Sequence, residues 1–182
     1  MRRQSDCGAC HAPLACGPVP TTRQQPRLRL RTARRADLPA LLALEQRAFR
    51  GDRLSARQFR HHLRSPSAWL AVVEGDGLLA GNALVFFRRG SRVARLYSIV
   101  VAAPARGRGV GARLLAAAEA AARRRGCREL RLEVRQDNAA AVALYEGAGF
   151  RRVADLPDYY EDGAAGWRYA RPIASRAARR PA

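Results

Sequence analysis

The chain has 182 residues, which suits one domain with a single core, and its hydrophobic content of 48% argues against disorder along the whole length. Its longest nearly apolar run, residues 78–87, is too short to span a membrane. Asp6 and His11 interrupt any apolar stretch near the start, so we expect no secretory signal and a cytoplasmic protein.

The formal net charge is +19, and all 34 basic residues are arginine. The charge is uneven: residues 1–35 carry eight arginines and one acid, and residues 171–182 carry four arginines and no acid. A basic surface raises encounter rates with an anionic cofactor, an acidic peptide or a ribosome, and it repels polyamines and aminoglycosides. Codon bias in a GC-rich genome explains the composition equally well, so the charge alone leaves the partner open.

Cysteines gather near the start of the chain, where Cys7, Cys10 and Cys16 lie close to His11. The run Cys-Gly-Ala-Cys-His matches a haem-attachment motif, and the four side chains are also of the types that bind zinc. Haem attachment by this route belongs to exported proteins, and the pairs are too close in sequence for a standard zinc module. We therefore expect residues 1–26 to be a flexible extension that binds no metal.

One strand and two helices are predicted next. Leu28 and Leu30 alternate with arginines, which is typical of a strand. Asp37 is placed to cap a first helix, and Ser55 is placed to cap a shorter one that ends near Leu63. The first helix carries its apolar residues on one face: Leu38, Leu41, Leu42 and Phe49.

Three strands follow, at residues 69–73, 78–87 and 95–101. The first two are joined by the hairpin turn Glu74-Gly75-Asp76-Gly77, whose glycines we expect to take positive φ. A Gly-rich turn then leads into a helix at residues 111–125, which Gly126 ends. Three residues of this helix are expected to face the core: Leu114, Leu115 and Ala118.

The C-terminal part again alternates between strand and helix. Cys127 is expected to be buried at the start of a strand in which Leu130, Leu132 and Val134 share one face, so Arg131 and Glu133 share the other. The remaining elements are a helix at residues 138–146 and strands at 150–153 and 167–173. The sequence thus predicts a mixed α/β domain at residues 27–173, followed by a basic tail at 174–182.

The turn Gly107-Arg108-Gly109-Val110-Gly111-Ala112 is typical of a phosphate site, although a plain tight turn is the simpler alternative. Glycines let backbone N–H groups approach an anion, and the helix that follows adds its own unpaired N–H groups. A P-loop is excluded because the chain has no lysine. A dinucleotide site stays open, since Glu133 falls roughly where a ribose-binding acid would lie.

Two segments together resemble the GNAT superfamily of N-acetyltransferases. Arg106-x-x-Gly109-x-Gly111, preceded by Ile99-Val100-Val101, is similar to the acetyl-CoA motif of that superfamily. The segment Leu132-Glu133-Val134-Arg135-Gln136-Asp137-Asn138, continued through Tyr145-Glu146, closely resembles the second motif of RimI-like ribosomal-protein-alanine N-acetyltransferases. The resemblance implies a GNAT fold: a central, twisted, mostly antiparallel sheet with flanking helices and a parallel pair of strands splayed at the acetyl-CoA site.

The resemblance also implies that acetyl passes directly from acetyl-CoA to an amine, without a covalent enzyme intermediate. Glu133 is then the candidate base, and Tyr145 is the candidate acid that protonates the leaving thiolate. Without the resemblance, Glu133 would be expected to form a salt bridge with Arg131 or Arg135, and Tyr145 simply to pack in the core.

Cofactor-binding roles follow from the same motifs, and no metal is implied. Ile99, Val100 and Val101 are implied to offer backbone groups to the pantetheine arm. The pyrophosphate is implied to lie against Arg106, Gly107, Arg108, Gly109, Val110, Gly111 and Ala112. Asn138 is a helix cap and an implied cofactor contact. One departure is visible, because Val101-Ala102-Ala103-Pro104 replaces the Val-Asp-Pro of many relatives and leaves the approach of this loop open.

The segment Tyr159-Tyr160-Glu161-Asp162-Gly163 resembles the acceptor side of RimI-like enzymes, so Tyr159 and Tyr160 are candidate substrate-binding residues; a surface turn is the alternative.

The leading hypothesis is acetylation of a protein N-terminal α-amine, as on a ribosomal protein. Within the same chemistry the alternatives are a lysine or a small amine. From another class, the alternative is a basic ribosome- or RNA-binding module with a vestigial cofactor site. The oligomeric state is not indicated.

Overall fold

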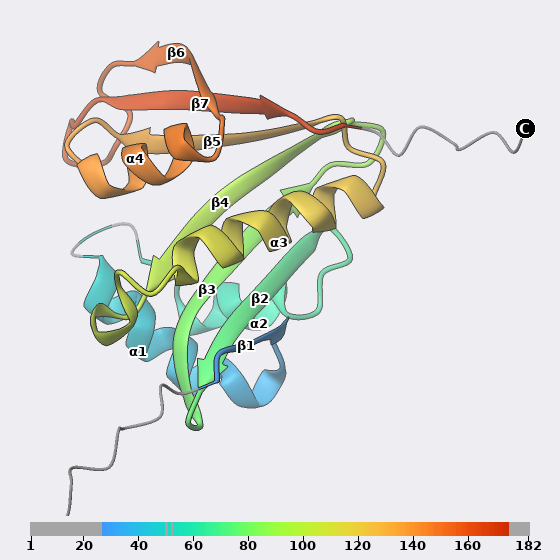
Figure 1. Ribbon diagram of the computed structural model, residues 1–182, viewed down its shortest axis with the longest axis vertical. Coiled ribbons are helices and arrows are strands. Elements are labelled where there is room, and N and C mark those ends of the chain that lie inside the picture. Colours follow the sequence, from blue (N-terminus) through green and yellow to red (C-terminus); the bar gives the residue numbers. More distant parts are fainter. Residues whose placement is uncertain (1–26, 50, 52, 175–182) are drawn as a thin grey trace, which may run out of the picture.

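A seven-stranded sheet in the order β1-β2-β3-β4-β5-β7-β6 runs through the protein (Figure 1). The computed structural model describes residues 27–49, 51 and 53–174, so the predictions for Cys7, Cys10, Cys16 and His11 lie outside the described residues. The strands are β1 (Arg29–Thr32), β2 (Ala68–Gly75), β3 (Leu78–Phe87), β4 (Val93–Val101), β5 (Glu129–Arg135), β6 (Arg151–Leu156) and β7 (Gly166–Pro172). The helices are α1 (Leu38–Ala48), α2 (Ala56–His62), α3 (Val110–Arg124) and α4 (Ala139–Gly147), with short 3-10 turns η1 (Arg35–Asp37) and η2 (Ala103–Ala105).

Strands β4 and β5 form the single parallel pair of this sheet, and every other neighbouring pair is antiparallel. Their ladder joins only residues 93–96 to residues 129–132, although both strands continue beyond it. The strands therefore splay apart after Leu96 and Leu132, as Figure 1 shows. At the same point β4 has a bulge. Leu84 pairs with Ser98 and Val85 pairs with Leu96, so Tyr97 is the extra residue of the bulge in the ladder. A bulge bends its strand, and this one lies where the splay begins.

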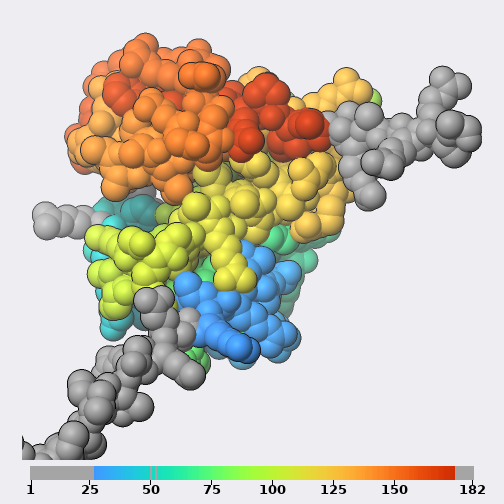
Figure 2. Space-filling model, in the orientation of Figure 1, coloured from blue at the N-terminus to red at the C-terminus, as the bar shows by residue number. Residues whose placement is uncertain are grey.

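Two hydrophobic clusters hold the helices on opposite faces of the sheet. One cluster packs α3 against β3, β4 and β5, and it includes the expected inward residues Leu114, Leu115 and Ala118 as well as Cys127. The other packs Leu41 of α1 and Phe59 of α2 against β2 and β3. Figure 2 shows the first of these faces, with α3 in yellow and the segment from α4 to β7 in orange and red above it.

The predicted helix ends are partly right. Ser55 caps α2 by accepting a hydrogen bond from the Gln58 backbone N–H at 3.3 Å, and Gly126 ends α3 with a φ of 75°. Asp37 lies at the expected N-cap position of α1, but its side chain makes no cap hydrogen bond to that helix. Asp37 adopts helical dihedral angles in η1, whereas a capping residue needs an extended backbone, and its carboxylate instead accepts hydrogen bonds from the Arg31 guanidinium at 2.7 and 2.8 Å.

The hairpin turn between β2 and β3 also differs from the prediction. Asp76 and Gly77 take positive φ, at 52° and 75°, whereas Gly75 is the last residue of β2. Two consecutive positive φ angles are typical of the tight hairpin turns that match the twist of their strands, and Asp tolerates this conformation better than most residues. None of the helices in the described ranges is long and apolar enough to cross a membrane.

Candidate active site

The N-terminus of α3 has the backbone shape of an anion site. Gly107 and Gly109 both have a φ of 72°, and Gly109 is the residue from which the helix starts. The first hydrogen bond of the helix runs from the Arg113 N–H to the Gly109 carbonyl at 3.0 Å. The amides of residues 110–112 therefore point out of the helix end, where they are available to an anion such as a pyrophosphate.

Close packing brings this helix end beside the splayed strands. A Cβ atom on Gly81 of β3 would lie 2.5 Å from the Val100 carbonyl oxygen and 3.1 Å from the Val110 side chain. A Cβ atom on Gly111 would lie 3.2 Å from Leu144 of α4. Glycine at these two positions thus allows β3, β4, α3 and α4 to converge at one point.

The end of β4 offers one free edge to the splay. Ile99, Val100 and Val101 pair with residues 81–83 of β3 on one side, and their ladder with β5 has already ended on the other. The chain keeps a compact path at residues 101–104, where the sequence departs from the Val-Asp-Pro of many relatives. Ala102 donates its N–H to the Ala80 carbonyl at 2.9 Å, and η2 then carries the chain to Arg106.

Glu133 is the first residue of β5 beyond the parallel ladder. Its side chain is only 9% exposed, and its carboxylate accepts hydrogen bonds from Arg95 Nε at 2.8 Å and from Arg168 Nε at 3.1 Å. Arg95 also donates through Nη2 to the Tyr159 hydroxyl at 2.9 Å. Arginines from the strands on both sides of β5 therefore hold the candidate base. One of them, Arg95, links Glu133 to residues 159–163, the candidate acceptor loop.

Glu133 is salt-bridged, as the alternative without the resemblance expected, but its partners Arg95 and Arg168 are not the two arginines named from the sequence. Arg131 pairs with Glu129, and Arg135 pairs with Asp137 and Asp162. Both arginines are thus paired with other acids, whereas Arg168 lies directly opposite Glu133 on β7, where Cβ atoms are about 5 Å apart, and Arg95 reaches the same carboxylate from β4. Sequence reasoning missed Arg95 and Arg168 because cross-strand neighbours follow from strand order.

A cleft of about 350 Å³ opens over this part of the sheet. Its walls come from β4, β5, β7 and the loop before β7: Val93, Arg95, Arg131, Glu133, Tyr159 and Arg168. Leu132 and Val134, the neighbours of Glu133 along β5, are buried in the cluster under α3, so the cleft lies on the opposite face of the sheet. The predicted orientation of Glu133 is confirmed.

Tyr145 lies on α4 within the core that packs against α3 and β5. Its ring centroid is 6.0 Å from that of Phe150, as the packing alternative expected. Burial, with a further contribution from Tyr160, raises the pKa of Tyr145 to about 12. The phenol is protonated at neutral pH, as an unperturbed tyrosine also is, and this is the state that a proton donor requires.

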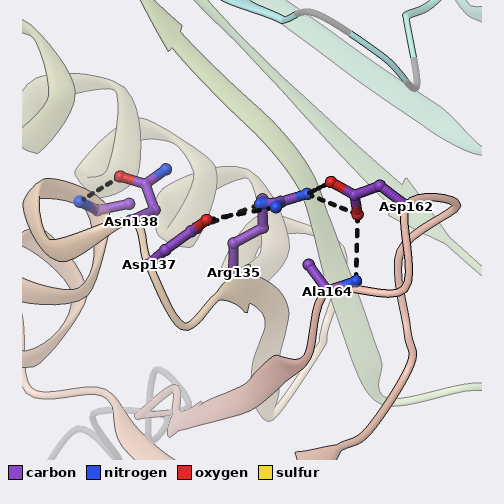
Figure 3. Close-up of polar contacts among 6 residues, drawn as sticks. Arg135, Asp137, Asn138, Asp162 and Ala164 are labelled. Atoms are coloured by element: carbon purple, nitrogen blue, oxygen red, sulfur yellow. Dashed lines mark hydrogen bonds and ion pairs between the residues drawn. The ribbon is translucent and has the colours of Figure 1, made fainter.

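Figure 3 shows how Arg135 ties the candidate acceptor loop to β5. Its guanidinium lies between Asp137, at 3.1 Å, and Asp162, at 3.0 Å, and the Asp162 carboxylate also accepts the Ala164 N–H at 3.2 Å. The same guanidinium lies 5.0 Å from the ring centroid of Tyr160.

Asn138 follows this network along the chain. Its side-chain oxygen accepts the N–H of Ala141 at 3.2 Å, so the helix cap predicted from the sequence is confirmed. The structure thus places the candidate acceptor loop and the start of α4 on either side of Arg135.

Comparison with known proteins identifies the family of this chain. Residues 36–150 match the model of the acetyltransferase (GNAT) family. The chain belongs to that family. Among solved structures, the ribosomal-protein-S18-alanine N-acetyltransferase from Escherichia coli superposes with a TM-score of 0.73 at 30% identity, over 86% of this chain and 99% of the other.

Other relatives of this GNAT protein differ in their named acceptors. An N-alpha-acetyltransferase of Sulfurisphaera tokodaii is 29% identical over 156 residues, covering 80% of this chain and 93% of the relative. A nourseothricin acetyltransferase superposes with a TM-score of 0.68 at 28% identity, over 81% of this chain and 99% of the other. The family is thus shown, and relatives of comparable identity carry names with different acceptors.

Family membership makes this GNAT protein an acetyl-CoA-dependent N-acetyltransferase. Of the two ligands that spacing left open at the Gly-rich turn, family membership favours acetyl-CoA over a dinucleotide. Within the described part of the chain, no three His, Cys, Asp or Glu side chains gather in a way that would hold a metal ion.

Proposed function

We propose that this GNAT protein acetylates the α-amine of a protein N-terminus, such as the N-terminal alanine of a ribosomal protein. The observation that carries the proposal is the position of Glu133. It lies where β4 and β5 begin to separate, and its carboxylate lines a cleft on the face of the sheet opposite α3. An amine entering the cleft would reach the splay from one face, while acetyl-CoA is held on the other.

The residues at the splay fit acetyl-CoA. Positive φ at Gly107 and Gly109 turns the backbone so that the first amides of α3 face a pyrophosphate, with Arg106 and Arg108 beside them. The free edge of Ile99–Val101 offers N–H and C=O groups to the amides of the pantetheine arm. Asn138 lies at the start of α4, which meets α3 through Leu144, and is assigned a contact with the same cofactor.

The chemistry assigned to the site needs one proton acceptor and one proton donor. Glu133, directly or through a water, takes a proton from the acceptor ammonium group. The free amine then attacks the thioester carbonyl, the N–C bond forms and the C–S bond breaks. Tyr145 gives its phenolic proton to the departing thiolate. The nitrogen loses its second proton as the amide forms, and this proton restores the phenol through solvent, so that the one proton taken up by Glu133 is released overall. Arg95 and Arg168 orient the Glu133 carboxylate throughout.

The acceptor side is assigned to the loop before β7. Tyr159 is 38% exposed, lines the cleft and stacks edge-to-face with Tyr160 at a centroid distance of 5.2 Å. Two relatives named for N-terminal substrates, from Sulfurisphaera tokodaii and Escherichia coli, support a peptide acceptor. The nourseothricin enzyme is the reason to test small amines as well. Association with the ribosome stays a prediction from the arginine content.

A panel of acceptors tests this proposal. Thiol release from acetyl-CoA would be measured with peptides that begin with a free alanine, with the same peptides blocked at the N-terminus but carrying a lysine, and with small amines. We expect turnover of the free α-amine peptides and little of the rest, with slower turnover by Tyr145→Phe. Acetylation of lysine or small amines, without any of the α-amines, would refute the proposal.

A further inference from the structure

The cleft around Glu133 holds an excess of positive charge. Three of its six lining residues are arginines, Arg95, Arg131 and Arg168, and Glu133 is the one acid among them. Arg131 pairs with Glu129 beside the cleft, so Arg95 and Arg168 share the single Glu133 carboxylate. This leaves one positive charge in excess at the place where the acceptor amine would bind.

Each of these guanidinium groups has capacity for a second anion. Arg95 and Arg168 contact Glu133 through Nε, and Arg95 uses one Nη on Tyr159. A guanidinium has five N–H donors, so several per arginine remain beyond these contacts. The side chains are also accessible: 46% of Arg95 and of Arg131 and 36% of Arg168 is exposed, against 9% of Glu133.

We propose that the cleft selects acceptor peptides with an acidic side chain at their second or third residue. This inference rests on the proposed N-terminal acetylation. Arg131 lies two residues along β5 from Glu133, which is a separation of about 7 Å. Two residues of an extended peptide span about the same length. With the α-amine at Glu133, a carboxylate on the second or third residue therefore reaches Arg131 or Arg95.

Electrostatics then discriminates between acceptors. An acidic side chain gains charge-assisted hydrogen bonds from the arginines, whereas a lysine or arginine at the same place meets like charge. The chain as a whole carries +19, which steers an acidic peptide toward the cleft as well. Because both effects are screened by ions, the selection weakens as salt is added.

The test uses three peptides that share an N-terminal alanine and differ only at their second and third residues. These two residues are acidic in one peptide, neutral in the next and basic in the third. We expect kcat/KM for the acidic peptide to exceed that for the basic one by on the order of tenfold at low salt, with a smaller ratio at high salt. Equal rates, or a preference for the basic peptide, would overturn the inference and leave N-terminal acetylation standing. If no α-amine is acetylated, the proposed function fails and this inference fails with it.

Matched variants locate the selection in the cleft. Arg131→Gln should lower the acidic-to-basic ratio below that of the wild type, with Arg95 left as the remaining arginine within reach. The control is Arg152→Gln, which removes an arginine of similar exposure, 47%, that pairs with Asp155 on β6 outside the cleft. We expect the control to keep the wild-type ratio. If Arg152→Gln lowers the ratio as much as Arg131→Gln does, the preference comes from net charge, and the cleft does not select.

Discussion

The two halves of the sheet use their faces differently. In the half from β1 to β4, α3 covers one face of the central strands β2 and β3, and α1 and α2 cover the other. Six consecutive residues of β3, Ala80 to Val85, are buried. In the half formed by β5, β7 and β6, burial alternates along β5, and the second face carries Glu129, Arg131, Glu133 and Arg135. The centre of the first half, β2 and β3, is therefore a platform with both faces covered. The second half, together with the adjoining face of β4 that bears Arg95, combines a buried face with a charged one.

The comparison shows where chemistry is placed in this fold. Strands buried on both faces cannot carry a charged base without a large desolvation penalty. A strand with one polar face can, provided that its neighbours supply counter-charges. The proposed base, Glu133, lies at the seam between the two halves, where β4 separates from β5.

The largest expected effect is at the seam itself. Glu133→Gln should lower kcat by about a hundredfold or more, because a neutral amide cannot accept the proton of the acceptor amine. Glutamine keeps the size and one oxygen acceptor for Arg95 and Arg168, so acetyl-CoA binding, measured by calorimetry, should be unchanged. The melting temperature must be recorded too, since the change leaves two guanidinium groups without their carboxylate. A kcat within a few-fold of wild type would remove Glu133 from the chemistry.

A smaller effect is expected on the platform side, at the start of α3. Gly109→Ala should weaken acetyl-CoA binding by about tenfold, because a left-handed backbone costs a residue with a Cβ about 1–2 kcal/mol. Gly90→Ala is the matched control, since Gly90 has a similar φ of 77° in the turn between β3 and β4, and neither new Cβ would meet an atom within 4 Å. Equal losses of acetyl-CoA affinity in the two variants would mean that general destabilisation, and not the anion site, is being measured.

A modest effect is expected at the end of β5, in the charged half. Arg135→Ala removes the contacts to Asp137 and Asp162 that hold the loop bearing Tyr159, so the acceptor KM should rise about threefold while kcat and acetyl-CoA affinity stay close to wild type. Steady-state kinetics with one peptide measures this split. Arg152→Ala serves as the control, because Arg152 also combines an ion pair with a ring contact, at Asp155 and Trp167. A fall in kcat with an unchanged KM would contradict a positioning role for Arg135.

The same contrast explains what the sequence could predict. Alternation in β5 correctly placed Leu132 and Val134 inside and Glu133 outside, since one face of that strand is solvated. The limits of β3, residues 78–87, also follow from its apolar run. The partners of Glu133 do not, because β5 lies between β4 and β7, and β7 is separated from it in the chain by α4 and β6. Register between strands that are distant in sequence is set by packing of the whole sheet and leaves no local signal.

The smallest effect should appear on the platform and concern stability alone. Glu45 of α1 is 3% exposed, its Oε1 accepts the Leu54 N–H at 2.9 Å, and burial raises its pKa above the usual carboxyl value. At low pH both the folded and the unfolded chain hold this proton, so there is no penalty. As the pH rises past the ordinary carboxyl pKa, the unfolded chain releases the proton first, and stability falls until the folded state ionises too.

Glu45→Gln removes this loss while keeping the oxygen acceptor, so it should raise the melting temperature by a few degrees at pH about 8 and change it little at pH about 4. Thermal scans at the two pH values decide the matter, and an equal shift at both would show that burial of the charge is not what costs stability there.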